Sequence, residues 1–145
     1  MNPPVDLAVY DRNGALVLLA EVKARKGTSR EWAQTLRRNL LAHGLPRAPY
    51  FLLVTPEESY LWTDKFNSGR EQGPDGAVPT TELLGKQITA STSGPAYHEE
   101  SLALLVAGWL SDLARGTDAP TADLRQLVHL SEAIRGGRVD LQPAA

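Results

Sequence analysis

Apolar residues gather in two runs near the start of the chain, on either side of an Asn-Gly pair. The second run, ALVLLAEV, is apolar at successive positions, which is typical of a strand that is covered on both faces. Asn13-Gly14 favours a two-residue type I′ turn, in which both central residues need a positive φ. The pattern therefore predicts a hairpin with strands at about 5–11 and 15–24, the second of them central in its sheet.

A helix and a second pair of strands are expected next. Thr28 and Glu31 have capping-box spacing and the Gly-Leu-Pro segment gives a stop, which together predict a helix over about 29–43. Its inward face is expected to carry Trp32, Leu36 and Leu40. The runs YFLLVT and SYLWT flank a Pro-Glu-Glu turn, and they predict strands at about 50–55 and 59–63.

The rest of the chain divides into a polar segment and two helical patterns. Residues 64–97 are rich in Gly, Pro, Ser and Thr, so we expect an irregular loop in which only TTELLG has a helical pattern. Apolar residues then recur at helical spacing and predict helices at about 98–115 and 121–135, the second ending at Gly136-Gly137. Residues 1–145 are thus expected to form one α/β domain, with a mixed sheet flanked by helices.

Composition restricts the class of protein. No apolar run approaches the roughly 20 residues that would span a bilayer, which argues against a membrane protein. The absence of cysteine excludes disulfides and thiolate metal sites. The opening residues MNPPVD lack the basic start and apolar stretch of a secretory signal, so a cytoplasmic location is expected.

Positive charge is concentrated in one region, although the whole chain has a formal net charge of -2. Between residues 23 and 47 the only acid is Glu31, and the bases are Lys23, Arg25, Lys26, Arg30, Arg37, Arg38 and Arg47. Two interpretations are open: an ordinary solvated loop and helix face, or a surface that holds a polyanion.

The hairpin prediction brings two acids together. If Asn13 and Gly14 are the turn residues, opposed positions sum to 27, so that Tyr10 faces Val17 and Ala8 faces Leu19. Continuing outward, Asp6 faces Glu21, and like charges directly opposite each other are destabilising. Lys23 points to the same face as Glu21, because side chains alternate along a strand.

A divalent cation would offset the repulsion between these two carboxylates. Mg²⁺ is commonly held by one or two carboxylates, with water and phosphate oxygens in its other positions. The alternative is a strand end at the rim of the sheet, where Lys23 pairs with an acid in water.

These residues resemble the PD-(D/E)XK nuclease superfamily, most closely the N-terminal nuclease domain of type I restriction-enzyme motor subunits. Pro4-Val5-Asp6 is similar to a loose Pro-Asp element, and Glu21-Val22-Lys23 matches the E-x-K element on a hairpin. The resemblance covers about residues 3–63. It implies a restriction-endonuclease-like fold, a mixed central sheet flanked by helices, and a metal-dependent DNA endonuclease related to defence or restriction.

The resemblance also implies roles for individual residues. Asp6, Glu21 and the carbonyl of Val22 would bind Mg²⁺, with Mn²⁺ as a substitute, and Lys23 would orient the attacking water or neutralise the phosphate. The basic residues expected to guide DNA are Arg25, Lys26, Arg30, Arg37 and Arg38. A homodimer is compatible with duplex cutting, since that takes two active sites, and a partner protein would be unknown.

The sequence differs from the family pattern in two places. Related members often carry Q-x-x-x-Y on the following helix; Gln34 fits, whereas Arg38 occupies the tyrosine position, so Gln34 is either a site residue or an ordinary surface residue. The family core also has a helix and a strand before the Asp-bearing strand, and here only three residues precede Pro4. We expect the C-terminal helix at 98–115 to fill that vacancy by a permuted order. Glu99 or Glu100 would then supply an extra acid, unless both only stabilise the helix start.

Other candidates for chemistry are weak. His43, His98 and His129 lack zinc-site spacing and are expected to be surface or cap residues, and Tyr60 and Trp62 are expected to be packing residues. The alternative to a nuclease is a catalytically inactive nucleic-acid-binding or assembly module with the same fold.

Overall fold

Strands from both ends of the chain join in one mixed sheet in the computed structural model, which describes residues 5–63, 73–85, 87, 98–118, 120 and 125–142. The strands are β1 (Leu7–Tyr10), β2 (Leu16–Val22), β3 (Tyr50–Val54), β4 (Glu58–Thr63), β5 (Gly76–Pro79) and β6 (Arg138–Leu141). Their order is β5-β4-β3-β2-β1-β6, with β2 and β3 parallel and every other neighbouring pair antiparallel. The expected α/β class with a mixed sheet is confirmed.

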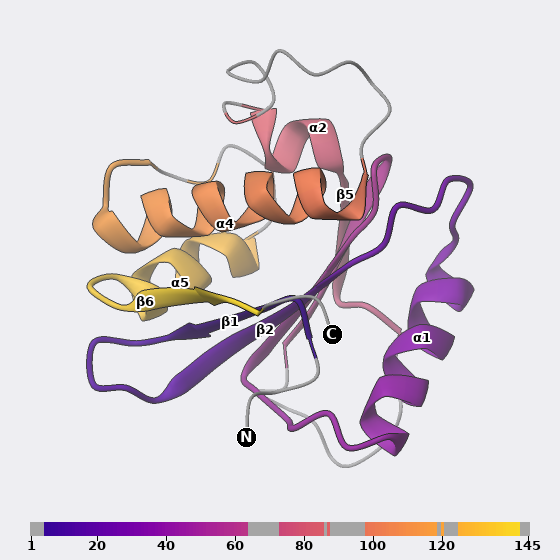
Figure 1. Ribbon diagram of the computed structural model, residues 1–145, viewed down its shortest axis with the longest axis horizontal. Coiled ribbons are helices and arrows are strands. Elements are labelled where there is room, and N and C mark those ends of the chain that lie inside the picture. Colours follow the sequence, from indigo (N-terminus) through magenta and orange to yellow (C-terminus); the bar gives the residue numbers. More distant parts are fainter. Residues whose placement is uncertain are drawn as a thin grey trace.

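Helices cover both faces of this sheet (Figure 1). They are α1 (Arg30–Ala42), α2 (Thr80–Leu83), α4 (Glu99–Arg115) and α5 (Arg125–Ile134). One core lies between the sheet and α4 and α5, and the smaller core lies on the α1 face. The helix expected at 98–115 therefore packs on the central sheet, on the face opposite α1.

The centre of the sheet is the unit β2-α1-β3. β2 is buried along nearly its whole length, as its run of successive apolar residues predicts. Because β2 and β3 are parallel, the chain must cross over between them, and α1 makes this crossover. Ser29, and not Thr28, caps α1 by accepting the Trp32 N–H at 3.1 Å. Thr28 instead hydrogen-bonds the Tyr60 hydroxyl at 2.8 Å.

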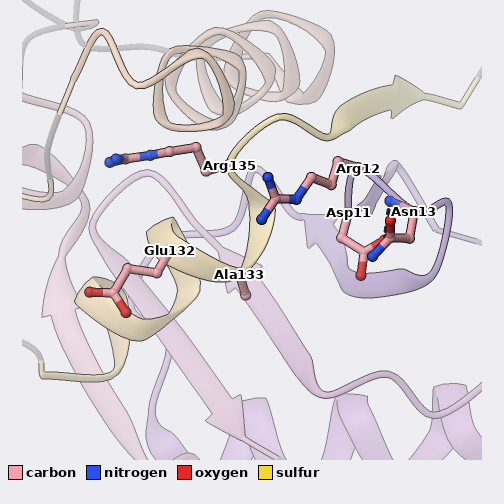
Figure 2. Close-up of a pocket in the computed structure, with 6 residues that line it drawn as sticks. All are labelled: Asp11, Arg12, Asn13, Glu132, Ala133 and Arg135. Atoms are coloured by element: carbon pink, nitrogen blue, oxygen red, sulfur yellow. Dashed lines mark hydrogen bonds between the residues drawn. The ribbon is translucent and has the colours of Figure 1, made fainter.

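The β1–β2 turn differs from the expected one. Only Gly14 takes a positive φ, of 86°, so a type I′ turn at Asn13-Gly14 is wrong. The Gly14 N–H donates to the Asp11 carbonyl at 2.9 Å, and Asp11 Oδ1 accepts the N–H groups of Asn13 and Ala15, also at 2.9 Å. Figure 2 shows Asp11 and Asn13 folded together in this loop. The short polar side chain of Asp11 thus stabilises a three-residue loop instead of a two-residue one.

A β-bulge corrects the register behind the turn. The longer loop makes Tyr10 face Leu16, where Val17 was expected. The pairing then shifts between Val9 and Tyr10, so that Ala8 faces Leu19 as the sequence predicts. The additional residue, Val17, is buried against the α4 side. Without the bulge every outer pair would be displaced by one residue, and Glu21 would no longer face Asp6.

Two strands were not foreseen. β5 lies inside the segment 64–97, so the expectation of a loop is wrong for residues 76–79, while α2 begins at the TTELLG segment. β6 follows Gly136-Gly137 and pairs antiparallel with β1. Gly137 is essential to this pairing, because a Cβ there would overlap the Tyr10 carbonyl oxygen. No helix among the described residues is long and apolar enough to cross a membrane.

Replacing Gly137 with alanine is expected to destabilise the fold by about 2–4 kcal/mol, because the new methyl group collides with backbone that cannot rotate away. Gly85→Ala is the matched control, since a Cβ there meets nothing within 4 Å. Chemical denaturation of the two variants and the wild type measures the difference. Equal free energies of unfolding for both variants would show that β6 does not approach β1 as described.

Candidate acidic site at the end of the hairpin

Asp6 and Glu21 lie side by side where the hairpin ends. Leu7 pairs with Ala20, and the same register carried one residue outward sets Asp6 opposite Glu21. The two carboxyl groups are hydrogen-bonded to each other, and Asp6 Oδ2 also accepts the Val22 N–H at 2.7 Å. Glu21 belongs to the sheet face that carries Leu19, which is the α1 face, whereas Asp6 lies just before β1 and reaches across the strand end to the Val22 N–H.

Burial makes Glu21 unusually basic. Its exposed fraction is 7%, and desolvation is the largest cause that raises its pKa, from 4.5 to about 8. The hydrogen bond to Asp6 and the charges of Asp6 and Glu99 raise the pKa further, while Lys23 lowers it. Without a bound cation, Glu21 is therefore mostly protonated at neutral pH and donates its proton to the Asp6 carboxylate.

The Val22 carbonyl points to the same side as the acidic pair. The Lys23 N–H donates to the Val54 carbonyl of β3 at 3.0 Å, so the opposite end of this trans peptide, the Val22 carbonyl, is directed towards β1. This agrees with the Val22 N–H, which bonds Asp6. Lys23 itself is partly exposed on the Glu21 face. Two carboxyl groups, one carbonyl and one ammonium thus surround the strand end.

Glu99 approaches the same strand end from α4. Its Oε1 accepts the Ala24 N–H at 3.3 Å, and its charge contributes to the raised pKa of Glu21. An open depression of about 380 Å³ lies alongside and includes Asp6, Glu99 and Glu100. Gln142, just past β6, lines it too and donates its backbone N–H to the Asp6 carbonyl at 2.7 Å. Sequence reasoning missed Gln142; the alternating RVDL run after Gly136-Gly137 was the available signal for a strand there.

The donor set suits a cation that needs few protein ligands. Among the described residues, no group of three or more histidine, cysteine, aspartate or glutamate side chains is placed to hold a metal ion. Two carboxylates and a carbonyl are nevertheless a sufficient protein contribution for Mg²⁺, which keeps several waters. His43, His98 and His129 are exposed, as expected of surface residues. Tyr60 and Trp62 are buried packing residues, also as expected.

Gln34 is not brought to the acidic pair. Its Oε1 lies beside Gly73, in the segment that leads into β5, at 3.5 Å from the position that a Cβ on Gly73 would take. β5 is at the opposite edge of the sheet from β6, with three other strands between it and β1. Of the two interpretations of Gln34, the arrangement favours a residue outside the site.

Arg37 corrects the expected orientation of α1. The sequence predicts Arg37 on an exposed, DNA-facing side, but its exposed fraction is 5%, and a role in guiding DNA is therefore wrong for it. The guanidinium lies over the rings of Phe51 and Trp62, 5.8 and 5.4 Å from their centroids. A planar guanidinium can cover aromatic rings in this way, so the helix turns Ala33 and Arg37 inward, while Trp32 is only half-buried.

The other basic residues of this region are exposed. Arg25 lies over the Trp32 ring at 5.7 Å, and Arg30 donates to the Pro74 carbonyl at 3.1 Å. Lys26 and Arg38 are exposed as well. These four side chains remain compatible with a surface for an anionic ligand.

A second depression, of about 400 Å³, lies at the far end of the hairpin (Figure 2). It is formed by the turn and the end of α5, and its lining mixes Arg12 and Arg135 with Asp11 and Glu132. None of the residues expected to carry chemistry belongs to it. Its balanced charge favours no particular ligand.

Comparison with family models, curated proteins and solved structures finds no match to this chain. The chemistry of the acidic pair is therefore inferred from its own geometry.

The raised pKa of Glu21 predicts how stability depends on pH in the absence of divalent cations. Between 4.5 and about 8 the folded chain keeps a proton that the unfolded chain releases, so the free energy of unfolding falls as pH rises, by at most about 1.4 kcal/mol per pH unit. Glu21→Gln is expected to remove this slope and to be more stable than the wild type at pH 8, with little difference at pH 4. Chemical denaturation between these pH values, in buffer that contains a chelator, measures the pH dependence of the free energy of unfolding. Glu31→Gln is the control, since Glu31 is exposed. Equal slopes in wild type and Glu21→Gln would contradict the buried pair.

Neighbouring arginines on α1 are expected to behave differently. Arg37→Ala should lower the free energy of unfolding by about 1–3 kcal/mol, because it uncovers Phe51 and Trp62. Arg38→Ala should change it by about 0.5 kcal/mol or less, since that side chain is exposed. Thermal and chemical unfolding give both values. A larger loss of stability in Arg38→Ala than in Arg37→Ala would show that Arg37, and not Arg38, lies on the exposed face of α1.

Proposed function

We propose that this chain is a metal-dependent DNA endonuclease of PD-(D/E)XK type, which hydrolyses phosphodiester bonds in a defence or restriction role. The observation that carries the proposal is the hydrogen-bonded pair of Asp6 and Glu21 at the ends of two paired strands, with Lys23 two residues beyond Glu21. Two opposed acids at a buried strand end destabilise the fold when both are ionised. A bound cation would offset the repulsion between the two carboxylates.

The arrangement of the termini supports a restriction-endonuclease-like fold in permuted order. The resemblance implies a helix and a strand beside the Asp-bearing strand. β6 pairs with the side of β1 that β2 leaves free. α4 covers the sheet face opposite α1 and brings Glu99 to the acidic end. In the proposed permuted order, β6 and α4 would take the places of that strand and that helix.

The fit of the site to Mg²⁺ or Mn²⁺ follows from its oxygen donors. Asp6, Glu21 and the Val22 carbonyl would hold the ion, which supplies Lewis acidity and lowers the pKa of bound water. Glu21 has to release its proton for this, so binding is expected to strengthen as pH rises towards 8. Lys23 is partly exposed and would neutralise a phosphate or orient the attacking water.

DNA would be held through its phosphates. Arg25, Lys26, Arg30 and Arg38 are exposed on α1 and the loop that leads into it, directly after the Lys23 end of β2. Each contact with a phosphate releases counterions, so affinity should fall steeply with salt. These residues would set the affinity for DNA without selecting a sequence.

A second candidate is a non-cleaving nucleic-acid-binding or assembly module with the same fold. It is favoured by the burial of Glu21, of which only 7% is exposed, and by its protonation at neutral pH. A carboxyl group that holds its proton through a hydrogen bond to Asp6 stabilises the strand end without any metal.

A cleavage assay separates the two candidates. Plasmid and single-stranded DNA are incubated with wild type, Glu21→Gln, Lys23→Ala and Lys26→Ala in Mg²⁺ or Mn²⁺. We expect wild type and Lys26→Ala to cleave, and the other two to lose about 100-fold or more in rate, since they remove a metal ligand and the electrostatic group beside the phosphate.

Two outcomes would reject the nuclease. Equal cleavage by wild type and Glu21→Gln would identify a contaminant. No cleavage by any variant, together with salt-sensitive binding that Lys26→Ala weakens, would favour the binding module.

A further inference from the structure

β6 forms an open edge of the sheet. It is last in the strand order, and in the part of the chain that the structure describes it pairs only with β1. Edge strands present unpaired backbone groups to any second strand.

Alternate residues of β6 direct their backbone groups outward. The Gln142 N–H bonds the Asp6 carbonyl, so Gln142, Asp140 and Arg138 face β1 in the regular antiparallel pattern. Val139 and Leu141 therefore turn their N–H and C=O groups away from β1. Gly137 also turns outward, but its N–H already donates to the Ile134 carbonyl at 2.9 Å.

The side chains of β6 are self-complementary in a single register. Pairing with a second copy about a twofold axis must place an outward residue opposite an outward residue. With Val139 opposite itself, Arg138 faces Asp140 of the other copy on both sides of the axis. With Val139 opposite Leu141, the Asp140 residues of the two copies face each other. With Val139 opposite Gly137, the two Arg138 residues face each other. Only the first register joins opposite charges and avoids like ones.

Exposed apolar side chains adjoin this edge. Leu141 is 46% exposed at the end of β6, and Leu104 of α4 is 61% exposed in the same depression. In the register centred on Val139, Leu141 lies opposite Gly137 of the second copy, which has no side chain to obstruct it. The charged side chains are accessible as well, since Arg138 and Asp140 are 61% and 40% exposed. They form a 3.4 Å contact with each other, and the Arg138 guanidinium lies over the Tyr10 ring at 4.3 Å.

We propose that two copies of this chain associate through antiparallel pairing of β6, with Val139 on the twofold axis, so that their sheets become continuous. The dimer requires no metal and no nuclease activity. Because only short strands are joined, its affinity is expected to be modest and visible as a concentration-dependent mass.

Charge reversal tests the register. Sedimentation of the full chain over a range of concentrations should give a monomer–dimer equilibrium. Arg138→Asp and Asp140→Arg should each weaken it by about tenfold or more, because both symmetric pairs become like-charged. The double variant Arg138→Asp/Asp140→Arg should restore it to within a few-fold, and circular dichroism confirms that all variants are folded.

Hydrogen exchange on the wild type provides a test that needs no substitution. The Val139 and Leu141 amides should gain protection as concentration rises, while the Asp140 amide, which faces β1, should be protected throughout. A chain that stays monomeric overturns the proposal and leaves Arg138 and Asp140 as charges that protect the edge. A dimer that is unaffected by either single reversal, or that does not protect Val139, overturns it as well.

Discussion

The opposition of Asp6 and Glu21 is the constraint on which the candidate site depends. Two carboxyl groups share a strand end where Glu21 is almost excluded from water. Both cannot be ionised at this separation without compensation, so one retains a proton or a cation intervenes. The raised pKa of Glu21 corresponds to the first state. In the second state the Val22 carbonyl, which is directed towards β1, would be a further ligand.

Elements distant in sequence maintain this opposition. The Val17 bulge restores the pairing that the three-residue loop would otherwise displace, and so sets Glu21 opposite Asp6. β6 fixes the outer side of β1 through the Gln142–Asp6 hydrogen bond. α4 contributes Glu99, whose carboxylate bonds the backbone just past Lys23. The site is therefore formed by both ends of the chain.

Sequence reasoning found the hairpin, the crossover helix and the acidic pair, because apolar periodicity and the alternation of strand side chains are local properties. The predicted turn was wrong, but the predicted register of the outer pairs was right, since the loop and the bulge shift the pairing in opposite directions. β6 is short and charged, and its pairing with β1 is a long-range contact that no local pattern encodes. Arg37 was misplaced because a cation can pack on aromatic rings whose position only the fold defines.

Anomalous diffraction from crystals grown with Mn²⁺ tests the central claim most directly, because it locates the ion without relying on activity. We expect a single strong peak between the carboxyl groups of Asp6 and Glu21, within about 2.0–2.4 Å of their oxygens and of the Val22 carbonyl. The peak should be lost in Glu21→Gln crystals. A peak elsewhere, or an acidic pair that stays hydrogen-bonded with no Mn²⁺ beside it above pH 8, would contradict a metal site at this strand end.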